Sequence, residues 1–157
     1  MKEGPDSNTG SGARETQAFP GGIKKLEAGA LLPDWVVRLD RTAFGAAWKA
    51  PADHECLWLI PEVAFARWAL IPAAGEAELL RIAVDPAYRG QSLGRVLLEA
   101  CQRDLAAEGL IRLFLEVRTS NAAAIRLYGA CGWQRCGLRS GYYPDGEDAV
   151  LFRHGRP

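Results

Sequence analysis

Residues 82–95 read IAVDPAYRGQSLGR, and this stretch decides the fold of the chain. Small and β-branched apolar residues come first, a turn and a glycine-containing loop follow, and a helical pattern begins at the end. From Leu93 the apolar residues recur at offsets of 3, 4, 7, 8 and 12 until Gly109. A loop between a strand and a helix N-terminus points backbone N–H groups and the helix dipole at one place. The stretch therefore predicts a strand, an anion-binding loop and a long helix.

The loop between Arg89 and Arg95 suits a pyrophosphate group. Its glycines let the backbone approach a ligand or adopt a positive φ, and the two arginines add positive charge. The alternative is a tight loop with an ordinary helix cap, for which Ser92 alone is adequate. The patterns GxGxxG and GxxxxGK[ST] are both absent, so neither a dinucleotide nor a nucleoside triphosphate is favoured.

Strand and helix patterns alternate on both sides of this stretch. The pattern predicts an early helix that opens at Pro33-Asp34 and a late one over 122–131, capped by Asn121. Short turns separate the runs 56–60, 63–71 and 76–84, which predicts an antiparallel meander, whereas a strand that follows the long helix pairs in parallel. The fold class is α/β (α+β), with a mixed sheet of about six to seven strands flanked by helices. The predicted strands are 23–26, 56–60, 63–71, 76–84, 111–117, 133–139 and 148–154.

Composition limits the function classes. The chain has 157 residues and no net charge, which indicates one globular domain and disfavours nucleic acid as the main partner. Residues 1–22 are rich in glycine and polar residues and predict a flexible tail, so the expected domain is 23–157.

No apolar run reaches the length of a membrane span and no apolar signal core opens the chain, so we expect a cytoplasmic protein with no membrane partner.

Metal binding is not expected from the cysteines and histidines. The four cysteines form no CxxC pair, and the two histidines add no ligand cluster. Cys101 and Cys131 fall on apolar helical faces, which disfavours a thiolate nucleophile, because such a group needs an electropositive and partly exposed setting. Buried reduced thiols are the simpler interpretation.

The residues quoted above resemble the GNAT acetyltransferase family, in which an Arg/Gln-x-x-Gly-x-Gly/Ala loop opens a helix. Here the loop reads RGQSLG over residues 89–94. The similarity continues in IAVDP before the loop, in LEVR and SNAAAI after it, and then in Leu127-Tyr128 and Gly132-Trp133. The closing YYPDGEDA, residues 142–149, resembles the RimI branch, the ribosomal-protein-alanine N-acetyltransferases. The resemblance covers about residues 23–153 and is strongest from residue 76.

This resemblance implies a sheet splayed between its fourth and fifth strands, with acetyl-CoA on one side and an acceptor peptide on the other. It places three residues along the pantetheine, seven around the pyrophosphate and one on the CoA arm. These are, in that order, Ile82, Ala83 and Val84; Arg89, Gly90, Gln91, Ser92, Leu93, Gly94 and Arg95; and Asn121.

By the same resemblance Glu116 is the general base and Tyr128 the general acid, while Tyr142 and Phe44 are candidates for acceptor binding. An α-amine has a pKa of about 7.7–8, so a carboxylate must remove its proton before it attacks a thioester. The pattern alone also allows Glu116 to be a solvent-facing strand residue and Tyr128 to be a core aromatic. Glu55, Glu76 and Glu78 are further carboxylate candidates.

Two positions depart from the family. Ser92 stands where the family usually has glycine, and a left-handed backbone there would cost about 1 kcal/mol or more and weaken CoA binding. Gly141 stands where RimI-like sequences commonly have asparagine. The basic residues Arg126, Arg135 and Arg139 are either a rim for CoA phosphates or a solvated face.

The expected function is N-α-acetylation of a protein, in particular an alanine-starting small-subunit ribosomal protein, by direct transfer from acetyl-CoA in a ternary complex. Two alternatives stay open. One is a GNAT enzyme that acetylates a lysine side chain or a small amine, and the other is a non-catalytic acyl-CoA sensor.

Overall fold

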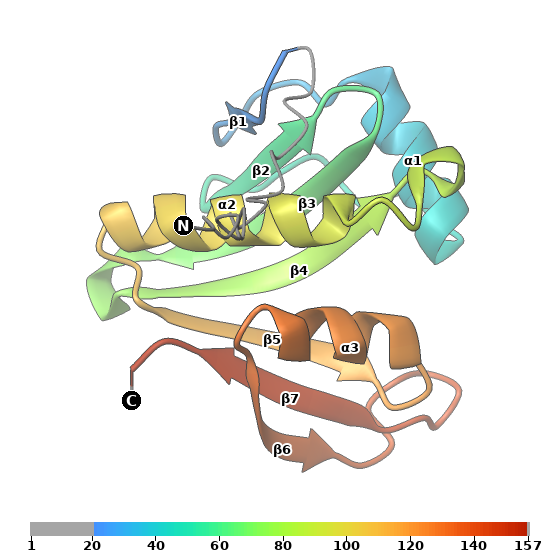
Figure 1. Cartoon of the computed structure of the whole chain (residues 1–157), viewed down its shortest axis with the longest axis vertical. Coiled ribbons are helices and arrows are strands. Elements are labelled where there is room, and N and C mark those ends of the chain that lie inside the picture. Colours follow the sequence, from blue (N-terminus) through green and yellow to red (C-terminus); the bar gives the residue numbers. More distant parts are fainter. Residues whose placement is uncertain (1–20, 157) are drawn as a thin grey trace, which may run out of the picture.

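A seven-stranded mixed sheet forms the centre of this computed structural model, which describes residues 21–156 (Figure 1). The predicted tail lies outside the described residues except for Gly21 and Gly22. The strands are β1 (Lys24–Leu26), β2 (Glu55–Ile60), β3 (Ala64–Ile71), β4 (Glu76–Val84), β5 (Arg112–Arg118), β6 (Gln134–Arg139) and β7 (Ala149–His154). The α-helices are α1 (Asp34–Phe44), α2 (Leu93–Ala107) and α3 (Ala122–Ala130), and the short 3-10 turns are Pro72–Ala74 and Pro86–Tyr88.

The strand order is β1-β2-β3-β4-β5-β7-β6. The first four strands form an antiparallel meander, as predicted. The chain then crosses over through α2 and returns as β5, which pairs in parallel with β4, and this prediction is also confirmed. The last strand, β7, lies between β5 and β6 and pairs with both in antiparallel fashion.

Helices cover the two faces of the sheet unequally. The larger apolar cluster lies between the sheet and α2 with α3, and includes Leu97, Leu115 and Trp133. A smaller cluster on the opposite face joins α1 to β2, β3 and β4 through Val36, Leu39 and Phe65. Because both faces of β2 are covered, all six of its residues are buried. We call the two sides of the sheet the α2–α3 face and the α1 face.

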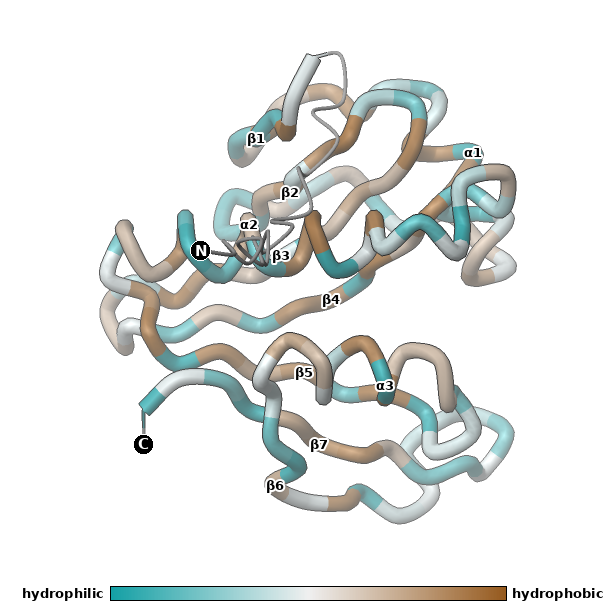
Figure 2. Tube along the Cα trace, in the orientation of Figure 1, coloured by the Kyte–Doolittle hydropathy of each residue, from teal (hydrophilic) through white to brown (hydrophobic). Residues whose placement is uncertain are grey.

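Hydropathy differs between the loop that follows β6 and the central strands of the sheet. In Figure 2 the loop between β6 and β7 is teal and white, whereas β2 and β3 carry much brown. Asn121 caps α3 as predicted, because its side-chain oxygen accepts a hydrogen bond from the N–H of Ala124 at 3.2 Å. No helix of the described residues is long and apolar enough to cross a membrane.

Candidate active site

A bulge in β4 opens the sheet. The pairing of β3 with β4 shifts between Arg67 and Trp68, which leaves Leu80 as an extra residue between Leu79 and Arg81. Pairing of β4 with β5 stops at Leu79 opposite Leu115, although both strands continue (Figure 1). A bulge bends its strand and increases the local twist. The divergence of β4 from β5 therefore begins where the bulge lies, and it agrees with the splay that the sequence resemblance implied.

The same bulge exchanges the faces of the residues that follow it. Ile82 and Val84 pack against the cluster on the α2–α3 face, whereas Ala83 joins the cluster on the α1 face. Beyond Leu79 the edge of β4 that looks toward β5 has no strand partner. At the predicted residues Ile82, Ala83 and Val84, the main-chain groups on that edge are not paired with β5 and suit an extended ligand, although the carbonyl of Val84 accepts from Nε of Arg89.

The loop before α2 presents a row of unpaired backbone donors. None of the N–H groups of residues 90–95 donates to another described residue. Gly90 has φ 76°, and Ser92 has φ 60° and ψ 19° and makes no side-chain capping bond. Ser92 is the N-cap residue of α2 but its side chain does not cap the helix, and the loop has the donors that an anion needs.

The other predicted residues of this loop lie as follows. Gln91 is exposed, Leu93 is buried in the core, and Gly94 faces the side chains of Leu127 and Val84, which an added Cβ would touch at 3.5 and 3.6 Å. Arg89 donates through Nε to the carbonyl of Val84 at 3.2 Å, and the exposed Arg95 donates through Nε to Glu99 at 2.8 Å.

Ser92→Gly should stabilise the protein without changing CoA affinity more than about twofold. Glycine relieves a left-handed conformation, with an expected gain of about 0.5–1 kcal/mol in unfolding free energy and about 2–3 °C in Tm. The backbone is already left-handed in this structure, so the strain is common to the free and the bound protein. Thermal unfolding and calorimetry with CoA check this result. Glu62→Gly, at φ 60° in the β2–β3 turn, is the matched control, and a CoA affinity that rises only in Ser92→Gly would show that binding orders the loop.

Glu116 lies on the α1 face of β5, at the point where β4 and β5 diverge. Its Oε1 forms an ion pair with Nη1 of Arg139 at 2.9 Å, and its side chain is 17% exposed. The carboxylate also interacts with the hydroxyl of Tyr142 and thereby raises the pKa of that tyrosine. The ring of Tyr142 lies 5.3 Å from the guanidinium of Arg139. Glu116 and the predicted Tyr142 thus belong to one cluster, and Arg139 joins them rather than forming part of a separate basic rim.

A cavity of about 250 Å³ extends from Glu116 over the paired part of β4 and β5. Burial, and then the charge of Glu116, raises the pKa of Glu78, which forms no ion pair within the described residues. Glu76 is paired with Arg112 at 3.2 Å. Of the further carboxylate candidates, Glu55 lies elsewhere, in a buried ion pair with Arg67. The cavity is lined by Ile71, Glu76, Glu78, Phe114, Leu115, Glu116, Cys136, Arg139, Leu151 and Phe152.

Tyr128 lies on the α2–α3 face and packs on Phe152, which is paired with Leu115 where the β4–β5 pairing stops. It is 6% exposed, and its ring centroid lies 6.0 Å from those of Trp133 and Phe152. Burial raises the pKa of Tyr128 strongly, so the hydroxyl stays protonated at neutral pH. The hydroxyl forms no hydrogen bond within the part of the chain that the structure describes. The geometry therefore combines the two sequence interpretations, because the ring is a core aromatic and the hydroxyl is an unused donor.

Phe44 lies on the α1 face at the end of α1, outside the lining of the Glu116 cavity. The Arg81 guanidinium lies 4.5 Å from the ring centroids of both Phe44 and Trp48, and donates to Asp40 at 2.6 Å. Because of the bulge, the Arg81 side chain lies on the α1 face. On this face β4 therefore carries both Glu78, in the cavity, and Arg81, which contacts Phe44. The structure therefore places the two predicted acceptor residues, Phe44 and Tyr142, on the same face but on different sides of the opening.

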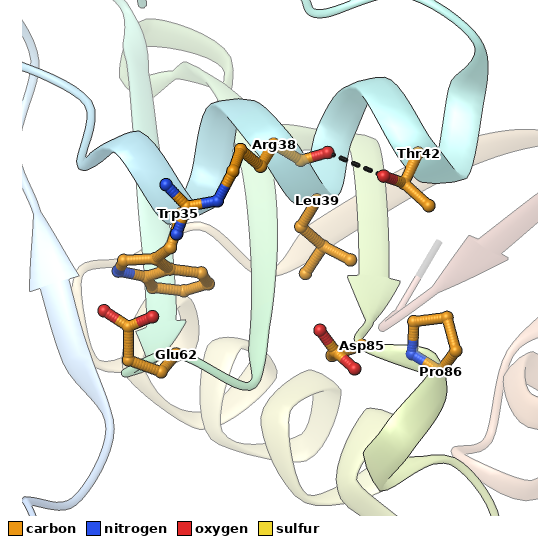
Figure 3. A pocket seen from close by; sticks show the side chains of 7 residues that line it. All are labelled: Trp35, Arg38, Leu39, Thr42, Glu62, Asp85 and Pro86. Atoms are coloured by element: carbon orange, nitrogen blue, oxygen red, sulfur yellow. Dashed lines mark hydrogen bonds between the residues drawn. The ribbon is translucent and has the colours of Figure 1, made fainter.

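A second cavity, of about 280 Å³, lies between α1, the β2–β3 turn and the end of β4 (Figure 3). It contains none of the predicted site residues. Two of its polar side chains are engaged locally, since Thr42 donates to the carbonyl of Arg38 at 2.9 Å and Asp85 accepts from the N–H of Ala87 at 2.8 Å. The lining residues are Trp35, Arg38, Leu39, Thr42, Glu62, Asp85 and Pro86.

Cys101 and Cys131 are buried and do not provide a nucleophile, whereas the exposed Cys136 lines the Glu116 cavity. Burial raises the pKa of Cys101 to about 12 and that of Cys131 to about 11, so both thiols are protonated at neutral pH. Within residues 21–156 no group of three or more His, Cys, Asp and Glu side chains could hold a metal ion. The described chemistry is that of carboxylates, a tyrosine hydroxyl and backbone N–H groups.

Sequence reasoning missed two features of the site. It did not pair Arg139 with Glu116, although the two lie on strands that flank β7, and it did not find the role of Glu147 in the β6–β7 loop. The alternation of side chains along β5 and β6 predicts which residues share a face of the sheet. It could have placed Arg139 beside Glu116 only if the order of the strands had been known.

Comparisons with known proteins agree with this geometry. Residues 24–133 match the model of the acetyltransferase (GNAT) family. Over 80 residues, 49% of this chain and 54% of the relative, the sequence is 52% identical to the [ribosomal protein bS18]-alanine N-acetyltransferase of Escherichia coli K12. The chain thus spans about half the length of the curated relatives it matches in this way. Over 134 residues, 76% of this chain and 86% of the relative, it is 35% identical to the putative [ribosomal protein bS18]-alanine N-acetyltransferase of Bacillus subtilis.

Solved structures show the same architecture. The ribosomal-protein-S18-alanine N-acetyltransferase from E. coli superimposes with a TM-score of 0.71 and 34% identity, over 85% of this chain and 92% of that chain. Ard1 from Thermoplasma volcanium, at 21% identity and a TM-score of 0.68 over 86% of this chain and 98% of that chain, shares the fold.

Proposed function

The chain belongs to the GNAT acetyltransferase family, and on this basis we propose that it transfers the acetyl group of acetyl-CoA to the N-terminal α-amine of a protein. The observation that carries the proposal is the placement of Glu116 and Tyr128 on opposite faces of the sheet, beside the divergence of β4 and β5. One face supplies a proton acceptor and the other a proton donor.

The described residues fit acetyl-CoA as the co-substrate. The free N–H groups of residues 90–95 suit its pyrophosphate, and the unpartnered edge of β4 at residues 82–84 suits the amide groups of its pantetheine arm. Asn121 uses its side-chain oxygen to cap α3, which leaves its side-chain N–H groups for the CoA arm. When bound, acetyl-CoA supplies the thioester that carries the acetyl group.

Glu116 accepts the proton of the acceptor amine in this proposal, directly or through water, so that the amine attacks as a neutral nucleophile. A backbone N–H of β4 near Ala83 or Val84 stabilises the charge that develops on the thioester oxygen. Tyr128 donates its proton to the departing thiolate. The transfer is direct in this proposal, in a ternary complex, with the acceptor amine as the nucleophile; the buried Cys101 and Cys131 thiols, whose pKa values burial raises, take no part.

The acceptor is an alanine-starting ribosomal protein of the small subunit in this proposal. Support comes from the relatives, which are named for alanine N-acetylation of ribosomal protein bS18. Tyr142 and Phe44 flank the acceptor on the α1 face, which α2 and α3 leave open. The domain that does this runs from residue 23 to 157.

Mass spectrometry of acetylated peptides tests the proposal. Equimolar peptides that begin with alanine, serine or methionine compete for the enzyme, together with a peptide that has a blocked N-terminus and one free lysine. We expect the alanine peptide to be modified first and the blocked peptide not at all. Modification of the lysine peptide alone, or of no peptide, would contradict the proposed acceptor.

A further inference from the structure

Glu147, in the loop between β6 and β7, joins that loop to the end of β5. Its Oε1 accepts hydrogen bonds from the backbone N–H of Ser120 at 2.8 Å and from the hydroxyl of Thr119 at 3.2 Å. Its Oε2 accepts from Nη1 of Arg118 at 2.8 Å. We call Glu147 and these three donors the Glu147 clamp. One carboxylate thus receives three donors from consecutive residues of another segment.

Arg118 extends the clamp to the tip of the loop. Its Nη1 also donates to both carboxylate oxygens of Asp145, at 3.0 and 2.8 Å. Its guanidinium lies 4.0 Å from the ring centroid of Tyr143. The N–H of Tyr143 in turn donates to the carbonyl of Glu147 at 3.0 Å, which closes the loop on itself. Charge, aromatic contact and backbone bonding therefore fix the loop in one conformation.

The fixed loop carries Tyr142. Its ring packs edge-to-face on Tyr143, with the centroids 5.1 Å apart. The Tyr142 ring lies 5.3 Å from the guanidinium of Arg139, which pairs with Glu116 at 2.9 Å, and the Glu116 carboxylate raises the pKa of Tyr142, although Tyr142 itself is 46% exposed. Because exposed packing holds Tyr142 only weakly, its place beside Glu116 depends on the loop that Glu147 anchors.

The other end of the clamp is better supported without Glu147. Ser120 and Thr119 precede Asn121, which caps α3 with its own side chain. The N–H of Asn121 also donates to the carbonyl of Arg118 at 3.0 Å, and that of Thr119 to the carbonyl of Asp148 at 3.2 Å. Without Glu147 the Tyr142 side keeps the exposed Arg118–Asp145 pair and the bond from the N–H of Gly141 to Oδ1 of Asp148 at 2.8 Å, whereas the start of α3 keeps backbone bonds and its cap. We therefore expect the loss of Glu147 to loosen the Tyr142 side more than the start of α3.

We propose that Glu147 is a positioning residue that holds Tyr142 beside Glu116 and so forms one wall of the acceptor site. The identity of the acceptor in this statement rests on the proposed function. Hydrogen bonds from Ser120, and next from Arg118, lower the pKa of Glu147 to about 2. The clamp therefore keeps its charge across the pH range of an acetylation assay.

Glu147→Ala and Glu147→Gln test the proposal in the full chain. We expect the KM for the alanine-starting peptide to rise at least about tenfold in the alanine variant and less in the glutamine variant, which keeps one oxygen for Ser120. The CoA Kd from calorimetry should stay within about threefold. Glu108→Ala is the matched control, because it removes a carboxylate that pairs with Lys25 at 2.6 Å away from the site, and its KM should not change. An unchanged KM in Glu147→Ala, or an equal loss of CoA affinity, would overturn the proposal.

Amide hydrogen exchange gives a readout that needs no activity. In Glu147→Ala the amides of residues 141–147 should exchange at least about tenfold faster, while those of β5 and β7 keep their protection. If the wild type acetylates no peptide, the proposed function fails. The amide exchange rates of the loop then test by themselves whether Glu147 holds the loop in place. Unchanged exchange in the loop would overturn the clamp whatever the enzyme acetylates.

Discussion

Glu116→Gln should lower kcat/KM for an alanine-starting peptide by about 10²–10⁴-fold, the range for loss of a general base. The amide has the same shape as the carboxylate but does not accept a proton from the acceptor amine. Arg139, the ion-pair partner of Glu116, is 55% exposed and stays solvated when the charge is lost. Steady-state kinetics should therefore show a loss in turnover, while calorimetry should show a CoA Kd within about twofold of the wild type.

Glu78→Gln is the matched control for this result, because Glu78 lines the same cavity and makes no ion pair within the described residues. We expect a loss of less than about tenfold. A loss equal to or larger than that of Glu116→Gln would assign the proton acceptor to Glu78 instead.

The pH profile separates the two carboxylates further. Burial raises the pKa of Glu78, so on acidification it becomes neutral at a higher pH than an ordinary glutamate. Its negative charge, which attracts the cationic acceptor, is present above that pKa and lost below it. The wild type should therefore lose kcat/KM on the acid side at a higher pH than Glu78→Gln does. If kcat/KM of the wild type and of Glu78→Gln fell at the same pH on acidification, this role of Glu78 would be contradicted.

Tyr128→Phe should lower kcat by about 10²-fold, as expected for loss of a general acid. The change removes only the hydroxyl, which forms no hydrogen bond within residues 21–156, and keeps the ring between Trp133 and Phe152. The free energy of unfolding should therefore change by less than about 0.5 kcal/mol. Single-turnover kinetics and thermal unfolding of the same preparation measure both quantities.

Tyr88→Phe provides the control for Tyr128→Phe. Tyr88 is 40% exposed and lies outside the lining of the Glu116 cavity, in the turn that precedes the loop of residues 89–95, so the kcat of Tyr88→Phe should equal that of the wild type. Burial also raises the pKa of Tyr128, so its proton stays in place as the pH rises and no alkaline loss below pH 10 should come from this group. A kcat that is unchanged in Tyr128→Phe would leave the ring a purely structural role.

Local chemistry explains why much of the site was predictable. The loop donors at residues 90–95, the cap at Asn121 and the helix that begins at Leu93 depend on residues within a few positions of one another. Glycine, a capping side chain and a periodic apolar face act within one or two turns. For the same reason the parallel return of β5 followed from the length of the crossover alone.

The sequence did not predict which residues of β4 lie on which face of the sheet. The bulge at Leu80 has no residue that marks it, yet it separates β4 from β5 and turns Arg81 toward Phe44 and Ile82 toward α2. A shift of one residue in the pairing of a strand exchanges every following side chain between the faces. The sequence could not show this shift, because the pairing with β3 determines it.

The sequence by itself determined the family, the order of the elements, the loop proposed to bind an anion and the candidate residues Glu116 and Tyr128. Tertiary structure alone decided that Arg139 pairs with Glu116, that Glu78 shares its cavity and that Glu147 anchors the Tyr142 loop. The members of each pair come from different strands or loops, and β7 has to enter between β5 and β6 before Arg139 reaches Glu116. Contacts of that kind follow from packing over the whole sheet, and no spacing along the chain encodes them.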